Sequence, residues 1–115
     1  MAYHWIKVFG SELEMENQMQ PGSILSLRIR NENICLVRNE KGCFAFNDKC
    51  PHNGASLSRG TCTESNEVVC PLHRYSFNLQ SGRATSGGAF SLLTYPIEIK
   101  PEGVFIGFKA SWWEL

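Results

Sequence analysis

Two short clusters of cysteine and histidine constrain this chain more than any other feature of its sequence. The first is Cys50-Pro51-His52 and the second is Cys70-Pro71-Leu72-His73, with residues 53–69 between them. Each cluster supplies one thiol and one imidazole, so the chain offers two Cys and two His as a set of metal ligands. A chain that uses all four must present two tight loops to one site from opposite sides.

The residue pattern around these clusters is specific to one kind of centre. A [2Fe–2S] centre in which two His replace two Cys on one iron requires this set of ligands. The first His is followed by Asn53-Gly54-Ala55-Ser56-Leu57, and the second by Tyr75, Phe77, Leu79, Ser81 and Gly82. In this order and spacing the chain resembles the small soluble Rieske ferredoxins, and it is also similar to the Rieske-like small subunits of some nitrite reductases.

The resemblance implies both a fold and a set of ligands. The fold expected is the all-β Rieske fold, in which three antiparallel sheets hold the cluster at one tip. Residues 1–115 would form a single Rieske domain, with a cluster-binding subdomain at about residues 44–83. Cys50 and Cys70 would bind one iron of a single [2Fe–2S] cluster, and His52 and His73 would bind the other, closer to solvent.

Two other uses of the same residues stay open at this point. A Cys2His2 set also suits a structural zinc site, although zinc sites usually pair ligands two to four residues apart. Here each pair mixes Cys with His, and Pro51 alone separates the first pair. A disulfide between Cys50 and Cys70 is the other alternative, and it is disfavoured in a chain expected to lie inside the cell.

Three further cysteines have no place in the cluster. Cys35 lies in an apolar run and is expected to be a small buried hydrophobe, whereas Cys43 and Cys62 lie near glycines and are expected to be surface thiols. High-potential Rieske proteins tie their two cluster loops with a disulfide, but this chain has Ala55 and Leu72 at the corresponding places. No loop-to-loop disulfide is therefore expected.

Residues beside the second His predict a low reduction potential. High-potential Rieske proteins carry a Ser two residues after this His and a Tyr four residues after it, and both hydroxyls stabilise the reduced cluster. This chain has Tyr75 and Phe77 at those offsets. We therefore expect a midpoint near the bottom of the Rieske range of about −150 to +300 mV. Arg74 is expected to be a solvated turn residue, and Gly54 to let backbone N–H groups turn toward sulfur.

The remaining sequence predicts short strands joined by turns. Alternation of apolar and polar residues, broken by turn residues, is typical of antiparallel sheets. The strands expected are residues 4–9, 23–30, 33–38, 43–47, 67–69, 75–78, 95–100 and 104–109, with a short helical turn at 11–18. His4 lies far from both clusters and is expected to be a structural residue rather than a ligand.

Composition limits where the protein works and what it binds. The formal net charge is zero, so no basic field favours nucleic acid or anionic lipid, and the net charge gives no clue to the partners. No apolar stretch is long enough to span a membrane, and the N-terminus does not resemble a signal peptide. A cytoplasmic monomer is expected.

These features together predict an electron carrier rather than an enzyme. A Rieske oxygenase also needs a mononuclear iron held by two His and a carboxylate, whereas only His4 is left over here. The resemblance implies a soluble ferredoxin that takes single electrons from a flavin-dependent reductase and passes them to a terminal oxygenase. The alternative is the small subunit of an assimilatory nitrite reductase, bound to a large subunit that carries flavin and haem.

Overall fold

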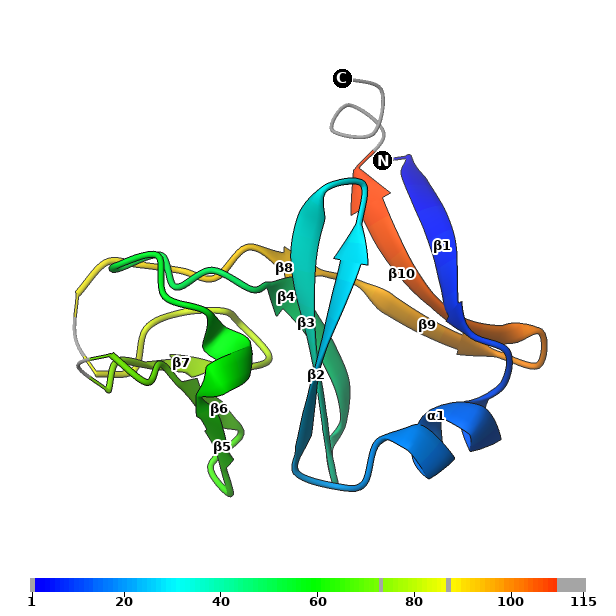
Figure 1. The fold of residues 1–115 in the computed structure, drawn as a ribbon, viewed down its shortest axis with the longest axis horizontal. Helices are drawn as coiled ribbons and strands as arrows, with labels where there is room; N and C mark the ends of the chain where they lie inside the picture. The colour runs from blue at the N-terminus through cyan, green and yellow to red at the C-terminus, as the bar shows by residue number, and fades with distance from the viewer. Residues whose placement is uncertain (1, 73, 87, 110–115) are drawn as a thin grey trace.

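The computed structural model describes residues 2–72, 74–86 and 88–109, which form an all-β protein with one α-helix and one 3-10 turn. Three antiparallel sheets have the strand orders β1-β10-β9, β2-β3-β4-β8 and β5-β6-β7 (Figure 1). The expected Rieske architecture is therefore confirmed. The elements are β1 (Tyr3–Phe9), α1 (Glu12–Gln18), β2 (Ser23–Ile29), β3 (Glu32–Asn39), β4 (Gly42–Asn47), η1 (Leu57–Arg59), β5 (Thr61–Thr63), β6 (Glu67–Val69), β7 (Ser76–Asn78), β8 (Thr94–Tyr95), β9 (Ile97–Lys100) and β10 (Gly103–Lys109).

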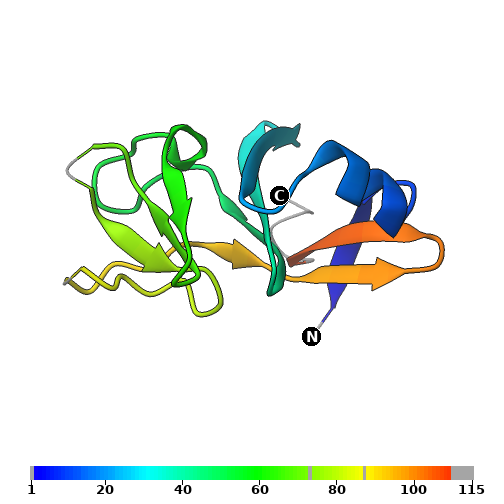
Figure 2. The ribbon, with the colours of Figure 1, turned by 90° about the horizontal axis from the view of Figure 1, so that it is seen from below.

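Strand β3 lies between two hydrophobic cores because apolar side chains occupy both of its faces. Ile34 and Leu36 face a core shared with β10, whereas Cys35 and Val37 face a core shared with the small β5-β6-β7 sheet. Successive residues of a strand point to opposite faces, so this continuous apolar run suits a strand covered on both sides. Figure 2 shows the small sheet at one end of the molecule and β1, β10 and α1 at the other.

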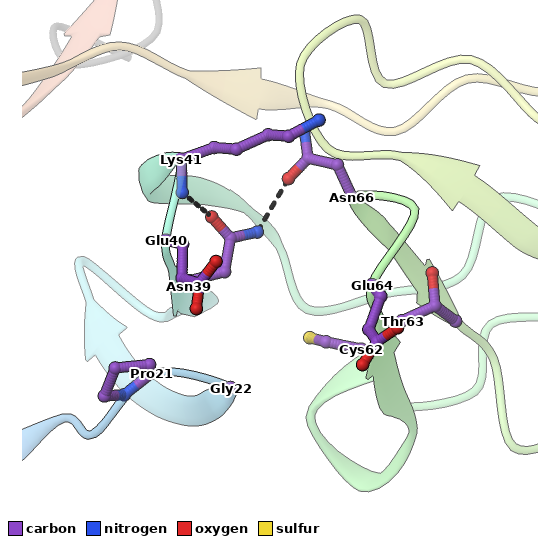
Figure 3. Close-up of a pocket in the computed structure, with 9 residues that line it drawn as sticks. All are labelled: Pro21, Gly22, Asn39, Glu40, Lys41, Cys62, Thr63, Glu64 and Asn66. Atoms are coloured by element: carbon purple, nitrogen blue, oxygen red, sulfur yellow. Dashed lines mark hydrogen bonds between the residues drawn. The ribbon is translucent and has the colours of Figure 1, made fainter.

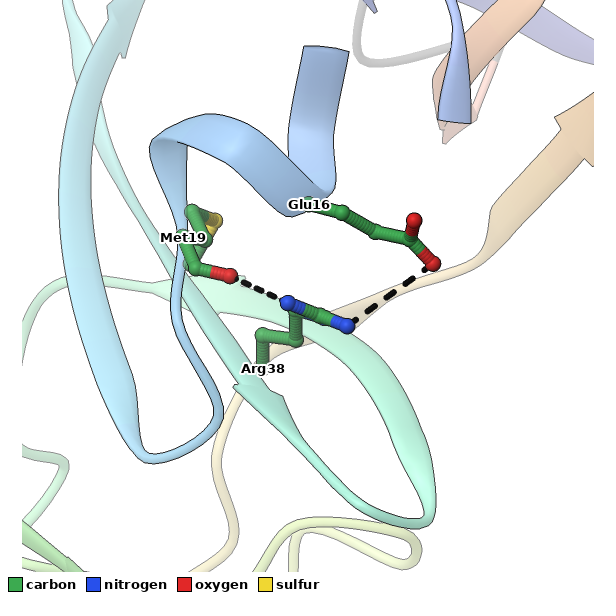
Figure 4. Close-up of polar contacts among 3 residues, drawn as sticks. All are labelled: Glu16, Met19 and Arg38. Atoms are coloured by element: carbon green, nitrogen blue, oxygen red, sulfur yellow. Dashed lines mark hydrogen bonds and ion pairs between the residues drawn. The ribbon is translucent and has the colours of Figure 1, made fainter. Parts of the chain in front are cut away.

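The helix expected at residues 11–18 is confirmed as α1. The Ser11 hydroxyl accepts a hydrogen bond from the Glu14 backbone N–H at 3.0 Å, and the Glu14 carboxylate accepts one from the Gly10 N–H. The first contact satisfies an N–H group that the first turn of a helix leaves unpaired, and the second pairs the N–H of Gly10, which precedes the Ser11 N-cap. After the helix ends, the Arg38 guanidinium of β3 donates to the Met19 carbonyl and pairs with Glu16 at 3.8 Å (Figure 4).

Most strands lie where the sequence predicts them, and the exceptions have local causes. The expected strand at 95–100 is divided into β8 and β9 by Pro96, which has no N–H to donate to a neighbouring strand. The outermost strand β9 also leaves Ile99 exposed, so its alternating pattern does not mark a buried face. Strand β5 was not predicted, because Thr61–Thr63 is short and has no alternation.

The three cysteines outside the clusters differ from one another in burial. Cys35 is fully buried, as expected, but Cys43 and Cys62 are half-buried, so the expectation of surface thiols was wrong. Both pack against the apolar cores. Burial raises the pKa of Cys43 to about 11, against an opposing effect of Arg38, and burial also raises the pKa of Cys62 to about 11.

These raised pKa values predict a loss of stability at high pH. A thiol that ionises at pH 9.0 when unfolded and at about 11 when folded stabilises the fold fully below pH 9, and this stabilisation is lost as the pH rises to 11. For the more deeply buried Cys43 this loss is at most about 3 kcal/mol, and it is smaller for Cys62, because solvent screens the less buried thiol. Urea midpoints at pH 8 and pH 10.5 should therefore differ less in a Cys43→Ala/Cys62→Ala variant than in the unmodified protein. An equal drop in both proteins would show that these thiols are not responsible.

Candidate metal centre

The first ligand loop is a tight turn closed by its own backbone. The Cys50 N–H donates to the Ala55 carbonyl at 2.8 Å, and the Gly54 N–H donates to the Cys50 carbonyl at 2.8 Å. Gly54 has a φ of 80°, which glycine adopts without strain. The expected conformational role of Gly54 is thus confirmed, but its own N–H is directed to a carbonyl oxygen rather than to sulfur.

The second ligand loop follows strand β6 and returns into β7. The Cys70 N–H donates to the Tyr75 carbonyl at 2.7 Å, which closes the loop between the two strands. Arg74 is exposed and has a φ of 57°, so the expectation of a solvated turn residue is confirmed. His73 lies outside the described residues, and its predicted role as a ligand stays a prediction.

Asn53 joins the two loops. Its side-chain N–H donates to the Leu72 carbonyl at 3.3 Å, and its side-chain oxygen accepts from the Ala55 N–H at 2.9 Å. The same oxygen lies 3.8 Å from the Cys70 sulfur, as an acceptor for the protonated thiol. Asn53 therefore fixes the separation of the loops, a role that the sequence did not reveal because its partner loop is distant along the chain.

The candidate thiol ligands Cys50 and Cys70 lie together beneath the two ligand loops. Their exposed fractions are 1% and 0%, and both belong to the core that contains Phe46, Phe77 and Leu57. Burial raises the pKa of Cys70; a backbone hydrogen bond at Leu72 opposes this, and interaction with the Cys50 thiol adds to it. Without a metal Cys70 is therefore a neutral thiol, and metal binding must displace its proton.

Aromatic rings hold His52, the described candidate imidazole, on two sides. The Tyr75 ring stacks on it at a centroid distance of 3.8 Å and an interplanar angle of 23°. Phe90, from the loop between β7 and β8, meets the imidazole edge-on at 5.3 Å. The sequence marked Tyr75 as the residue that stands where high-potential proteins have a Ser, and it did not mark Phe90, which reaches the site from outside both motifs. These rings restrict the orientation of the imidazole.

The donor set of the tip fits a [2Fe–2S] group. Two adjoining buried thiols match the sulfur ligands of one iron, and an imidazole nearer the surface matches a nitrogen ligand of the other. Among the described residues, no three His, Cys, Asp or Glu side chains are grouped as ligands of a single metal ion. A two-iron group does not need such convergence, because it divides its ligands between two metals.

Asp48 anchors the first ligand loop from behind. This buried carboxylate accepts hydrogen bonds from the Ser58 N–H at 2.6 Å and from the hydroxyls of Ser58 and Ser56 at 2.8 and 2.9 Å. A longer contact at 3.4 Å reaches the Ser26 hydroxyl of β2. The carboxylate therefore ties the segment before Cys50 to the 3-10 turn and to the base of the molecule.

Replacing Asp48 with alanine should destabilise the protein substantially. The change leaves the Ser56 and Ser58 donors without their acceptor, and hydrogen bonds to a charged group contribute about 1.5–3 kcal/mol each. We expect a loss of about 3 kcal/mol in the free energy of unfolding, measured in urea. Asp48→Asn keeps the shape and one carbonyl acceptor, so it should lose less. If both variants unfold at the same urea concentration as the unmodified protein, the anchor has no energetic role.

A polar cavity of about 420 Å³ lies away from the ligand loops, where the β3-β4 hairpin meets the turn between β5 and β6 (Figure 3). The Asn39 side chain spans it, donating to Asn66 at 2.6 Å and accepting from the Lys41 N–H at 2.8 Å. Cys62 lines the cavity, but its raised pKa keeps the thiol neutral near pH 7. The contacts of Asn39 therefore link the β3-β4 hairpin to the turn between β5 and β6, and the thiol that lines the cavity is not ionised near pH 7.

Comparisons with known proteins agree on one family and one fold. Residues 7–96 match the Rieske [2Fe-2S] domain family. The chain is 39% identical over 83 residues to the ferredoxin subunit of a 3-phenylpropionate/cinnamic acid dioxygenase from Shigella boydii, a match covering 70% of this chain and 78% of that protein.

Solved structures with the same fold include two that bear on the alternatives. A chain in the complex of reduced oxygenase and oxidised ferredoxin in carbazole 1,9a-dioxygenase has a TM-score of 0.73 and 30% identity, covering 89% of this chain and 91% of that one. A protein from Mycobacterium tuberculosis described as an NADH-dependent nitrite reductase small subunit has a TM-score of 0.80 over 96% and 99% of the two chains. At 21% identity this second likeness shows the fold alone.

Proposed function

This chain belongs to the Rieske [2Fe-2S] domain family, and on that premise we propose that it carries single electrons to a terminal oxygenase. The proposal rests on the arrangement of the two ligand loops, where two adjoining buried thiols lie near an imidazole that is in contact with two aromatic rings. The relative from Shigella boydii is named as a ferredoxin subunit, separate from its oxygenase. The reaction would therefore take place in a partner protein.

Four residues would hold the cofactor. Cys50 and Cys70 would bind one iron as thiolates, and His52 and His73 would bind the other as neutral imidazoles. When bound, the [2Fe–2S] group supplies a one-electron couple, with a potential raised by the replacement of two thiolates by imidazoles. Asn53 keeps the loops at a fixed separation, and the core around Phe77 keeps water from the thiol side.

The proposed partners are a flavin-dependent reductase as donor and a terminal oxygenase as acceptor. The relative from Shigella boydii is named as the ferredoxin subunit of a dioxygenase, and the carbazole dioxygenase structure is a complex of a ferredoxin with its oxygenase. These names support an oxygenase as the acceptor here. We also propose that the whole chain is one domain, that it is a monomer and that it works in the cytoplasm. Among the described residues, no helix is long and apolar enough to cross a membrane.

The small subunit of a nitrite reductase is the second candidate. It is supported by the full-length likeness to the Mycobacterium tuberculosis protein, which bears on fold rather than activity. Affinity purification of the chain from its own cells separates the two candidates. A stable complex with a large subunit carrying flavin and haem would favour nitrite reduction, whereas a free ferredoxin reduced by a separate reductase would favour the oxygenase system.

The cofactor itself is tested by metal analysis of protein purified without oxygen. We expect two irons and two acid-labile sulfides per chain, and uptake of one electron on chemical reduction. One zinc per chain, with no visible absorbance, would overturn the assignment.

A further inference from the structure

We propose that the tip of the molecule is a cationic docking face with an apolar centre, and that it binds redox partners through carboxylate-rich surfaces. The tip loops are defined here as the described residues 49–56, 70–72, 74–75, 84–86 and 88–93. This inference rests on the proposed electron-carrier function and adds the chemistry of the partner.

The charges of the chain are unevenly distributed, although they sum to zero. The tip loops contain two cationic residues, Lys49 and Arg74, and no Asp or Glu among the 11 acidic residues of the chain. Three of those acids, Glu12, Glu14 and Glu16, lie on α1, which packs beside β1 and β10 at the other end of the molecule (Figure 1). A net charge of zero for the whole chain is therefore compatible with a positive electrostatic potential at the tip loops.

The loops that carry the two cations contact one another and the third loop. Asn53 of the first loop is hydrogen-bonded to Leu72 of the second at 3.3 Å, and the His52 and Phe90 rings join the first loop to the third. Lys49 is exposed, and its Cε lies 3.8 Å from the point where a Cβ on Gly54 would stand. Its side chain thus runs along the first loop, while the exposed Arg74 lies in the second.

Apolar side chains lie among these charges. Leu72 and Phe90 are 48% and 39% exposed, although both are large hydrophobic residues. Phe90 also contacts the His52 ring, so a partner that covers it approaches the candidate imidazole ligand directly. An apolar centre with a charged rim is typical of a specific protein interface.

The nearest carboxylate does not cancel the surface charge of this face. Asp48 precedes Lys49 directly but is buried, and its oxygens accept hydrogen bonds from Ser56 and Ser58. A partner at the tip therefore meets Arg74 with no acid in the tip loops, whereas Lys49 shares a hollow with the half-buried Glu32, whose carboxylate accepts a hydrogen bond from the Asn47 side chain at 3.2 Å. Partners with carboxylates around their own redox centre would be steered to this face, and partners with lysines there would be repelled.

Small inorganic oxidants test the sign of the field without any knowledge of the partner. In stopped-flow experiments the reduced protein gives one electron to ferricyanide, which becomes ferrocyanide, or to hexaamminecobalt(III), which becomes cobalt(II). We expect the ferricyanide rate to fall as salt is added and the hexaamminecobalt rate to rise. A Lys49→Gln/Arg74→Gln variant should lose about tenfold in the ferricyanide rate at low salt, the lower end of the usual range for electrostatic steering.

Two controls separate steering from other effects. Lys7→Gln/Lys109→Gln removes the same number of charges from β1 and β10 and should leave both rates unchanged. The midpoint potential of each variant is measured so that rates are compared at equal driving force. The redox-inert anion chromicyanide provides a reading independent of rates, because its paramagnetic broadening of amide NMR signals should be strongest in the tip loops.

Each outcome decides the proposal. Equal salt dependence for both oxidants, broadening away from the tip, or equal effects of the two double variants would overturn it, while the carrier function would stand. A protein that accepts no electron would instead refute the proposed function. Concentration-dependent dimerisation abolished by Leu72→Ser would show that the face binds a second copy of the chain, which would also overturn the proposal.

Discussion

Replacing Cys70 with alanine is expected to eliminate the cluster completely. Cys70 is fully buried beside Cys50, and no other thiol takes part in the two ligand loops. An iron that loses a thiolate in this apolar site has no replacement ligand from water, so the cluster should not assemble. The purified variant should contain no stoichiometric iron or sulfide and should lack visible absorbance.

The matched control is Cys62→Ala, which removes a thiol from the neighbouring strand β5. Cys62 is half-buried and packs against the same core, but it lies outside both loops. This variant should keep two irons per chain. Retention of the cluster in Cys70→Ala, or its loss in Cys62→Ala alone, would show that the ligands have been assigned incorrectly.

Replacing Phe77 with alanine is expected to have the largest effect on stability. Phe77 has no exposed surface and lies in the core that contains both candidate thiol ligands. Removing a buried phenyl ring leaves a cavity and costs about 3–5 kcal/mol. Because this cavity opens beneath Cys50 and Cys70, the variant should also lose its visible absorbance faster than the unmodified protein at the same temperature.

Phe108→Ala provides the comparison that isolates the local effect. Phe108 is equally buried, but it lies in the other core, where its ring meets Tyr95 at 5.0 Å. The Phe108→Ala variant should lose a similar amount of free energy of unfolding, measured in urea, but it should lose iron more slowly than Phe77→Ala. Equal rates of iron loss at equal stability would mean that the core beneath the ligands offers no special protection.

The parts of the site that the sequence predicts are those fixed by local chemistry. Cys50, His52 and Cys70 were identified from the types of residue and their spacing, and the structure places all three in adjoining loops or beneath them. Gly54 was identified as a turn residue, and its positive φ agrees with that interpretation. Such residues are recognisable because the loop itself dictates which side chains fit.

The parts that the sequence did not predict depend on contacts between distant segments. Asn53, Phe90 and Asp48 act through partners on other loops, and no local pattern marks them. The half-buried state of Cys43 and Cys62 likewise depends on which strands cover them. Pairing of β5 with β6 similarly arises from tertiary contact, because the three-residue strand has little preference of its own.

The distribution of charged residues over the surface also depends on the fold. A net charge of zero gave no clue to the partners, although Lys49 and Arg74 lie in loops whose sequence contains no acid. The positions of these charges were present in the sequence. Their proposed role depends on the fold, which brings the described residues of the three tip loops into contact.

The most direct test of the account is a reductive titration of anaerobically purified protein, followed by EPR and visible absorbance. The reduced protein should give a rhombic two-iron signal with a low average g value. Its midpoint should lie near the lower limit of the Rieske range, about −150 mV, because Phe77 lacks a hydroxyl and Tyr75 stacks on His52. A midpoint above about +100 mV would contradict the low-potential assignment, and a colourless, EPR-silent protein containing one zinc would contradict the electron-carrier function altogether.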